Sequence, residues 1–132
     1  MLLKKFLNDV HVLGVLANSD YDFYLTGSRY FNTKNNSISD WDIFVQYSEE
    51  VENLLIELGF IPKSKTIYNT FQGLKKIYHN KMYNVDVQLI DNAYLKNEIQ
   101  TKIKESRIFD LKHYNKKERT IVWETAYQLY KL

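Results

Sequence analysis

The chain has 132 residues, of which 45% are hydrophobic and 26% are charged, a composition typical of a folded globular protein and not of a disordered chain. Eighteen basic and sixteen acidic residues leave a formal net charge of +2, so no strong overall field gathers nucleic acid. The absence of cysteine excludes disulfides and thiolate metal sites and is compatible with a reducing compartment.

Residues 1–17 are expected to form a surface helix that packs on the core, because apolar side chains recur there at helical spacing. Asn8, Asp9 and His11 interrupt the apolar run that a signal peptide would need. No apolar run of the chain is long enough to span a membrane. We therefore expect a cytoplasmic protein with no membrane partner.

Strand-like runs alternate with helical runs after this point. The strand-like runs combine apolar, aromatic and β-branched residues and end at turn signals; they cover residues 21–25, 40–47, 73–78 and 82–90. The helical runs show apolar residues at helical spacing or capping signals; they begin at Ser28, after the Ser48 cap and, twice, in residues 92–132.

This pattern predicts an α+β fold with a mixed, mostly antiparallel sheet of about four strands. Helices are expected on one face of the sheet and at the C-terminus. We expect a single domain over residues 1–132, with a core in residues 1–91 and C-terminal helices in residues 92–132.

Three aspartates interrupt these predicted strands, where a carboxylate is costly to bury. Asp40 and Asp42 are two residues apart and so leave the same face of one strand, and Asp86 lies on a later strand. If the two strands are neighbours, the three side chains converge and repel each other unless a hard divalent cation screens them. We therefore predict a Mg²⁺ or Mn²⁺ site with Asp40, Asp42 and Asp86 as its ligands.

The turn at residues 26–28 is the predicted phosphate site. Gly27 lets a phosphate approach the main chain, and a helix that begins at Ser28 directs free backbone N–H groups towards it. The Ser28 hydroxyl adds a donor, while Arg29 is equally compatible with a phosphate contact and with a solvated position. A phosphate site beside a metal site indicates phosphoryl or nucleotidyl transfer.

The spacing of these motifs resembles that of a known family. Gly-Ser at residues 27–28, followed after eleven residues by Asp-Trp-Asp at 40–42, resembles the Gly-Ser and Asp-x-Asp signature of the DNA polymerase beta-like nucleotidyltransferase superfamily. Asn-Val-Asp-Val at 84–87 resembles the strand that carries the third carboxylate of that family. The resemblance covers residues 21–90, including the order of the elements.

The resemblance implies a minimal nucleotidyltransferase fold that transfers a nucleoside monophosphate from an NTP to an acceptor hydroxyl. It implies that Asp40 and Asp42 bind the metal ion and that Asp86 helps to bind it or takes the proton of the attacking hydroxyl. It also implies that Ser28 and the main chain after Gly27 hold the triphosphate. Since no separate nucleic-acid-binding domain is present, the chain resembles the small stand-alone members, which include antibiotic-modifying, antitoxin-type and phage proteins.

Several alternatives stay open. The same fold could serve as a catalytically weak or inactive module that binds a nucleotide or a partner protein, for example in conflict between phage and host. The acceptor of an active enzyme could be a protein, an RNA or a small molecule. The basic residues 112–119 could follow a nucleic-acid backbone, but they are more typical of a solvated helix face. His79 is expected in a surface turn at residues 79–81, and Lys75 and Lys76 on a solvated strand.

Overall fold

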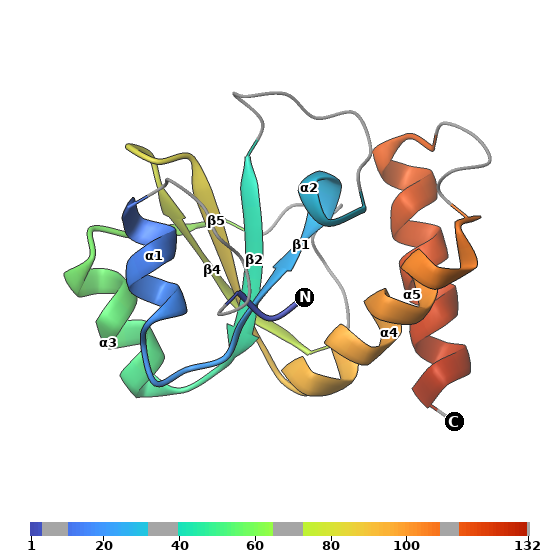
Figure 1. Cartoon of the computed structure of the whole chain (residues 1–132), viewed down its shortest axis with the longest axis horizontal. Coiled ribbons are helices and arrows are strands. Elements are labelled where there is room, and N and C mark those ends of the chain that lie inside the picture. The colour runs from blue at the N-terminus through green and yellow to red at the C-terminus, as the bar shows by residue number, and fades with distance from the viewer. Residues whose placement is uncertain (4–10, 32–39, 65–72, 109–113, 132) are drawn as a thin grey trace.

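The computed structural model describes residues 1–3, 11–31, 40–64, 73–108 and 114–131, which form a five-stranded sheet and five helices (Figure 1). The strands are β1 Phe23–Thr26, β2 Trp41–Gln46, β3 Ile61–Lys63, β4 Leu74–Asn80 and β5 Val85–Ile90. The helices are α1 His11–Ala17, α2 Gly27–Phe31, α3 Glu49–Glu57, α4 Ala93–Ser106 and α5 Lys116–Lys131. The predicted α+β class and the mixed sheet are confirmed.

The strands lie in the order β1-β2-β5-β4-β3. The pair of β2 and β5 is parallel, and the other three pairs are antiparallel. Paired residues of adjacent strands point to the same face of a sheet. One row on this face crosses all five strands; it consists of Thr26, Asp42, Asp86, His79 and Ile61.

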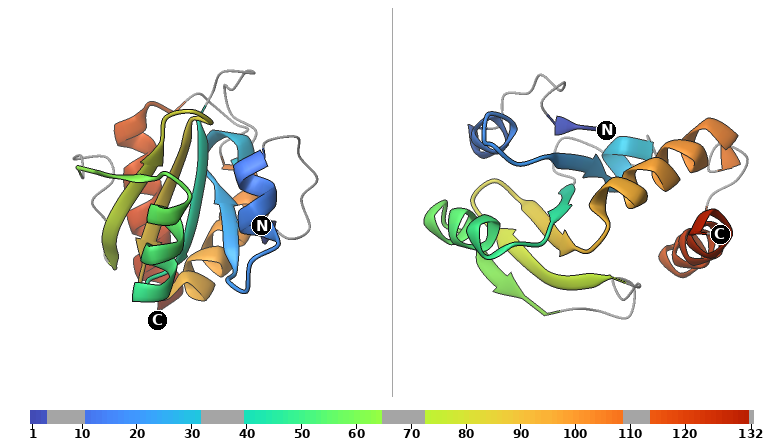
Figure 2. Two further views of the ribbon diagram at one scale, coloured as in Figure 1. Left: turned by 90° about the vertical axis from the view of Figure 1, so that its left-hand side faces the viewer. Right: turned by 90° about the horizontal axis from the view of Figure 1, so that it is seen from below.

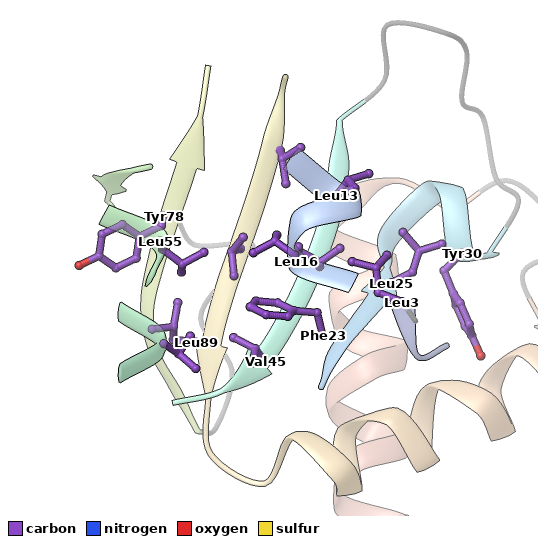
Figure 3. Close-up of a cluster of buried hydrophobic side chains, with 14 of the residues drawn as sticks. Leu3, Leu13, Leu16, Phe23, Leu25, Tyr30, Val45, Leu55, Tyr78 and Leu89 are labelled. Carbon is purple, nitrogen blue, oxygen red and sulfur yellow. The ribbon is translucent and has the colours of Figure 1, made fainter. Parts of the chain in front are cut away.

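The larger core lies on the opposite face of the sheet, where α1 and α3 cover it (Figure 1 and Figure 2). Its side chains come from these two helices and from alternate strand positions, with further buried side chains from α2, α4 and α5. Those labelled in Figure 3 include Leu13, Leu16, Phe23, Val45, Leu55 and Leu89. All six are fully buried or nearly so. This apolar face anchors β2 and β5, the strands that carry the aspartates.

A smaller apolar cluster lies on the face that carries the aspartates. It includes Tyr24, Phe44, Ile77 and Ile90, and Tyr24 and Phe44 stack with their ring centroids 5.2 Å apart. β5 is therefore covered on both faces, as its almost uniform burial indicates. Phe44 lies two residues after Asp42 and on the same face, so part of the surface beside the carboxylates is apolar.

The sheet has five strands rather than about four, and the strand missing from the prediction is β3. It is only three residues long, contains Pro62 and is exposed along its whole length. These residues give no alternation of apolar and polar side chains to recognise. Proline is tolerated at this position because β3 is an edge strand.

The predicted turn at residues 79–81 is wrong, because β4 continues to Asn80 and the turn occupies residues 81–84. Asn84 takes a positive φ of 53°, which asparagine tolerates better than most residues. The Asn80 side chain accepts a hydrogen bond from the backbone N–H of Tyr83 at 3.2 Å. The shift moves His79 from a surface turn into the strand, directly opposite Asp86.

The N-terminal prediction also needs correction, because residues 1–3 do not belong to the first helix. Leu2 instead forms an isolated antiparallel bridge with Tyr24 on the edge strand β1, and α1 begins at His11 within the described residues. The rest of the predicted helix, the loop at 32–39 and residues 112–113 of the basic run lie outside the described residues. Among the helices that the structure describes, none has the length and apolar character needed to cross a membrane.

The predicted Ser48 cap of α3 is confirmed, since its Oγ accepts a hydrogen bond from the backbone N–H of Val51 at 3.1 Å. Ser48→Ala should lower the free energy of unfolding by about 1 kcal/mol, because one backbone donor of the first turn loses its partner. Ser48→Asp, which keeps an acceptor there, should behave like the parent in urea denaturation. Equal stability of the alanine and aspartate variants would contradict this assignment.

Candidate metal centre

The structure brings Asp40, Asp42 and Asp86 together at one end of the parallel strand pair. Asp42 of β2 and Asp86 of β5 are direct neighbours in register, and Asp40 immediately precedes β2. One carboxylate oxygen from each of the three lies within 4.8 Å of the others. Asp86 is buried, Asp42 is partly buried and Asp40 is exposed, so the aspartate trio opens to solvent on the Asp40 side.

Asp86 is held by one side chain from the adjacent strand β4 and one from β3, the strand beyond it. His79 Nδ1 lies 2.6 Å from Asp86 Oδ1, and Lys63 Nζ donates to Oδ2 at 3.0 Å. An ionised carboxylate can only accept, so the ring hydrogen of His79 belongs on Nδ1. Both oxygens of Asp86 therefore have a partner within the chain, and the carboxylate is fixed in orientation.

Burial and like charge act together on Asp42. Desolvation, with smaller contributions from Asp86 and Asp40, raises the pKa of the Asp42 carboxyl from 3.8 to about 6. Lys63 and Lys96 lower it, but they do not compensate for the burial and the two carboxylates. The trio consequently has more negative charge than the surrounding lysines neutralise.

Lys96 is a buried cation on the floor of the site. Its Nζ donates to Gln88 Oε1 at 2.8 Å and lies 4.7 Å from the centroid of the Phe44 ring and 5.4 Å from that of Trp123. Gln88 and Phe44 are paired one row below Asp86 and Asp42. Burial lowers the pKa of Lys96 to about 7, although the charge of Asp42 opposes that change.

Gly27, the first residue of α2, lies against Asp42. It has a φ of +72°, which favours glycine, and a Cβ at this position would lie 2.5 Å from Asp42 Oδ2. Thr26, the residue before it, is paired with Asp42 in the sheet. The main chain at Gly27 therefore adjoins the Asp42 carboxylate without a side chain between them.

Arg29 contacts the protein near the same aspartates. Its guanidinium group lies 4.1 Å from the centroid of the Trp41 ring, and its Nε donates to the main-chain oxygen of Asp40 at 3.2 Å. These contacts tie α2 to the start of β2 and help to position Asp40. A phosphate contact by Arg29 or Ser28 stays a prediction.

Three side chains that the sequence did not point to belong to this site: Lys63, His79 and Lys96. The position of His79 follows only once the turn is placed at residues 81–84. Lys96 did carry a signal, because it is spaced three and seven residues from the buried Ile99 and Ile103 and so lies on the inner side of α4. Lys63 carried none, since β3 has no recognisable pattern.

Lys75 and Lys76, in contrast, form ion pairs with acidic residues that do not belong to the trio. Lys75 pairs with Asp91 at 3.2 Å and Lys76 with Glu52 at 2.5 Å, and both lysine side chains are about half exposed. The expectation that they belong to the solvated part of the strand agrees with these contacts.

The donor set fits a hard divalent cation. Mg²⁺ and Mn²⁺ prefer carboxylate oxygens, and oxygens bound to one Mg²⁺ at about 2.1 Å lie no more than about 4.2 Å apart. The carboxylate oxygens of the trio lie within 4.8 Å of one another, so at most small side-chain rotations would close it around an ion. Burial raises the pKa of Asp42 and the two neighbouring carboxylates add to the rise, and a bound ion would neutralise that negative charge.

Comparisons with known proteins add no further assignment: no family model matches the chain, and no curated protein or solved structure is significantly similar to it. The functional argument therefore depends on the geometry of the site.

Asp42→Asn should stabilise the metal-free protein at neutral pH. An acid whose pKa is higher in the folded than in the unfolded protein costs stability above its unfolded pKa. This loss of stability is absent below pH 3.8, grows between pH 3.8 and about 6, and is complete above that pH. Removal of the charge should therefore raise the free energy of unfolding by about 2 kcal/mol near pH 7.5, after allowance for the partial exposure of Asp42.

The measurement is urea unfolding in EDTA at two pH values, one below 3.8 and one above 6. The stability difference between the variant and the parent should vanish at the lower pH. A variant that is less stable than the parent at both pH values would show that the ionised Asp42 carboxyl does not destabilise the folded protein.

Gly27→Ala should disturb the Asp42 carboxylate directly, because the new methyl group would overlap Oδ2 and because alanine disfavours the φ of +72°. We expect a loss of about 1–3 kcal/mol in unfolding free energy. Gly59→Ala is the matched control: Gly59 also has a positive φ, +88°, but a Cβ there meets nothing within 4 Å. If both substitutions cost the same, the close approach to Asp42 contributes nothing beyond backbone strain.

Proposed function

We propose that the protein is a Mg²⁺- or Mn²⁺-dependent nucleotidyltransferase of the DNA polymerase beta-like type. It would transfer a nucleoside monophosphate from an NTP to the hydroxyl group of an acceptor. The observation that carries the proposal is the aspartate trio, with carboxylate oxygens within 4.8 Å of one another, beside a glycine main chain that has no room for a side chain.

The proposed reaction is a single displacement. The acceptor oxygen forms a bond to the α-phosphorus of the NTP, the bond from that phosphorus to the oxygen bridging to the β-phosphate breaks, and pyrophosphate leaves. Asp86 is the proposed acceptor of the hydroxyl proton, because His79 fixes its carboxylate in orientation.

A divalent ion held by Asp40, Asp42 and Asp86 would supply the positive charge that neutralises the phosphate oxygens during the transfer. The chain contributes the orientation of these ligands. Asp42 and Asp86 are held by the register of β2 and β5, and Arg29 holds the main chain at Asp40. Such fixed geometry favours the in-line arrangement of the reacting atoms that phosphoryl transfer needs.

The main chain at Gly27 and the hydroxyl of Ser28 are the proposed contacts of the triphosphate. A bound phosphate needs close approach to the backbone, and the absence of a side chain at Gly27 permits it on the side of Asp42. The acceptor is a protein, an RNA or a small molecule, and the site gives no preference among them.

A second candidate is a module that binds a nucleotide or a partner protein without turnover. The ion pair between Lys63 and Asp86 favours it, because that carboxylate already has a cation within the chain. Binding of an NTP that raises the melting temperature without release of pyrophosphate would support this second candidate.

The two candidates are separated by incubation of the protein with each α-³²P-labelled NTP, Mg²⁺ and a cell lysate. We expect label in one class of macromolecule or small molecule and loss of at least about a hundredfold in rate for Asp42→Asn, since the metal would lose an anionic ligand. Asp91→Asn is the matched control, because Asp91 pairs with Lys75 at the surface and not with the trio. Equal labelling by Asp42→Asn and the parent would contradict the proposed function.

A further inference from the structure

We infer that Lys63 sets the affinity of the aspartate trio for a divalent cation, because its ammonium group takes the place of that cation on Asp86 in the metal-free protein. The inference rests on the proposed function, since it concerns the same carboxylates. It goes beyond that function by assigning a role to a side chain of the edge strand β3.

Lys63 reaches Asp86 from two strands away. β4 lies between β3 and β5 in the sheet, so the lysine side chain must extend over β4 to meet the carboxylate. Lys63 is paired with Ile77 and not with His79 in the sheet. Its side chain must therefore also extend along the strand direction, to the row that contains His79 and Asp86. It nevertheless donates to Asp86 Oδ2 at 3.0 Å. The negative charge of the trio is the physical reason for this reach.

His79 and Lys63, the two side chains that bind the Asp86 carboxylate, differ in how easily they can move away from it. His79 is short and stands directly opposite Asp86 in the antiparallel pair, so its contact with Oδ1 is set by the sheet. Lys63 has a long stem on an exposed edge strand, and its side chain is 40% exposed against 11% for Asp86. When an ion binds the trio, Lys63 is therefore the partner that leaves, and Oδ2 becomes a ligand.

Two effects make Lys63 weaken ion binding. Its contact with Oδ2 must break before that oxygen can bind the ion, and its charge then repels the ion at short range. Both effects act in the same direction, and the exposure of the side chain limits their size. A purely structural lysine would instead leave the ion affinity unchanged when it is replaced.

The test is a titration of the full-length protein with Mn²⁺ alone, in which free Mn²⁺ is measured by electron paramagnetic resonance. Lys63→Met should bind Mn²⁺ about fivefold more tightly than the parent. In EDTA the same variant should melt at a lower temperature, because the trio has lost a counter-charge. Lys63→Arg, which keeps the cation, should bind Mn²⁺ no more tightly than the parent.

Lys75→Met is the matched control for net charge, since Lys75 is on β4 and pairs with Asp91 outside the trio. If Lys75→Met tightens Mn²⁺ binding as much as Lys63→Met, or if Lys63→Met binds no more tightly than the parent, the role of Lys63 is refuted. Should Lys63→Met fail to fold, Lys63→Gln takes its place with the same expectation.

Asp42→Asn in the same titration separates this inference from the proposed function. If Asp42→Asn loses Mn²⁺ binding while Lys63→Met matches the parent, only the role of Lys63 fails. If Asp42→Asn binds Mn²⁺ as the parent does, or if neither the parent nor Lys63→Met binds the ion, the metal site and the role of Lys63 fail together. Binding by Lys63→Met alone would support the inference most strongly.

Discussion

The parallel pairing of β2 with β5 places Asp42 and Asp86 side by side, and this juxtaposition of like charges governs the rest of the site. Burial raises the pKa of Asp42 to about 6, and the neighbouring Asp86 adds to the rise. The juxtaposition also accounts for the cations that gather there, with Lys63 on Asp86 and Lys96 below Asp42. Gly27 belongs to the same constraint, because a larger residue would displace the Asp42 carboxylate. Each of these features alone lowers the stability of the fold. Together they are compatible with a divalent ion bound among the carboxylates.

The two faces of the sheet differ: one carries the larger apolar core and the other carries the candidate site. The face covered by α1 and α3 is an apolar core whose buried side chains hold β2 and β5 in register. The other face carries the row that crosses the sheet, which is polar except for Ile61, with only a small apolar cluster beside it. Strain at the carboxylates is therefore tolerated, because the strands that carry them are fixed by packing on the far side. From the C-terminal helices, Lys96 extends its ammonium group to 4.7 Å from the centroid of the Phe44 ring and 5.4 Å from that of Trp123.

The sequence was sufficient to predict the helices and strands that have strong local patterns. It was not sufficient where the pairing of one strand with another decides whether a segment is a strand or a turn. Alternation in β2, the Ser48 cap and the helical spacing of α4 all predict elements that the structure contains. The convergence of the three aspartates required the assumption that β2 and β5 are neighbours, which only the resemblance of the motifs to a known signature implied. β3 was missed because three exposed residues around a proline are a strand only through their pairing with β4. His79 was misplaced because a shift of the turn by a few residues transfers a side chain from solvent to the site.

The most direct measurement of the central claim is a crystal structure of the protein with Mn²⁺ and a non-hydrolysable NTP analogue, with anomalous diffraction collected at the manganese edge. The account predicts an anomalous peak bonded to carboxylate oxygens of Asp40, Asp42 and Asp86, with the triphosphate against the main chain at residues 27–28 and Lys63 withdrawn from Asp86. An anomalous peak at other residues, or a nucleotide bound away from Gly27 while the trio keeps its present contacts, would contradict it.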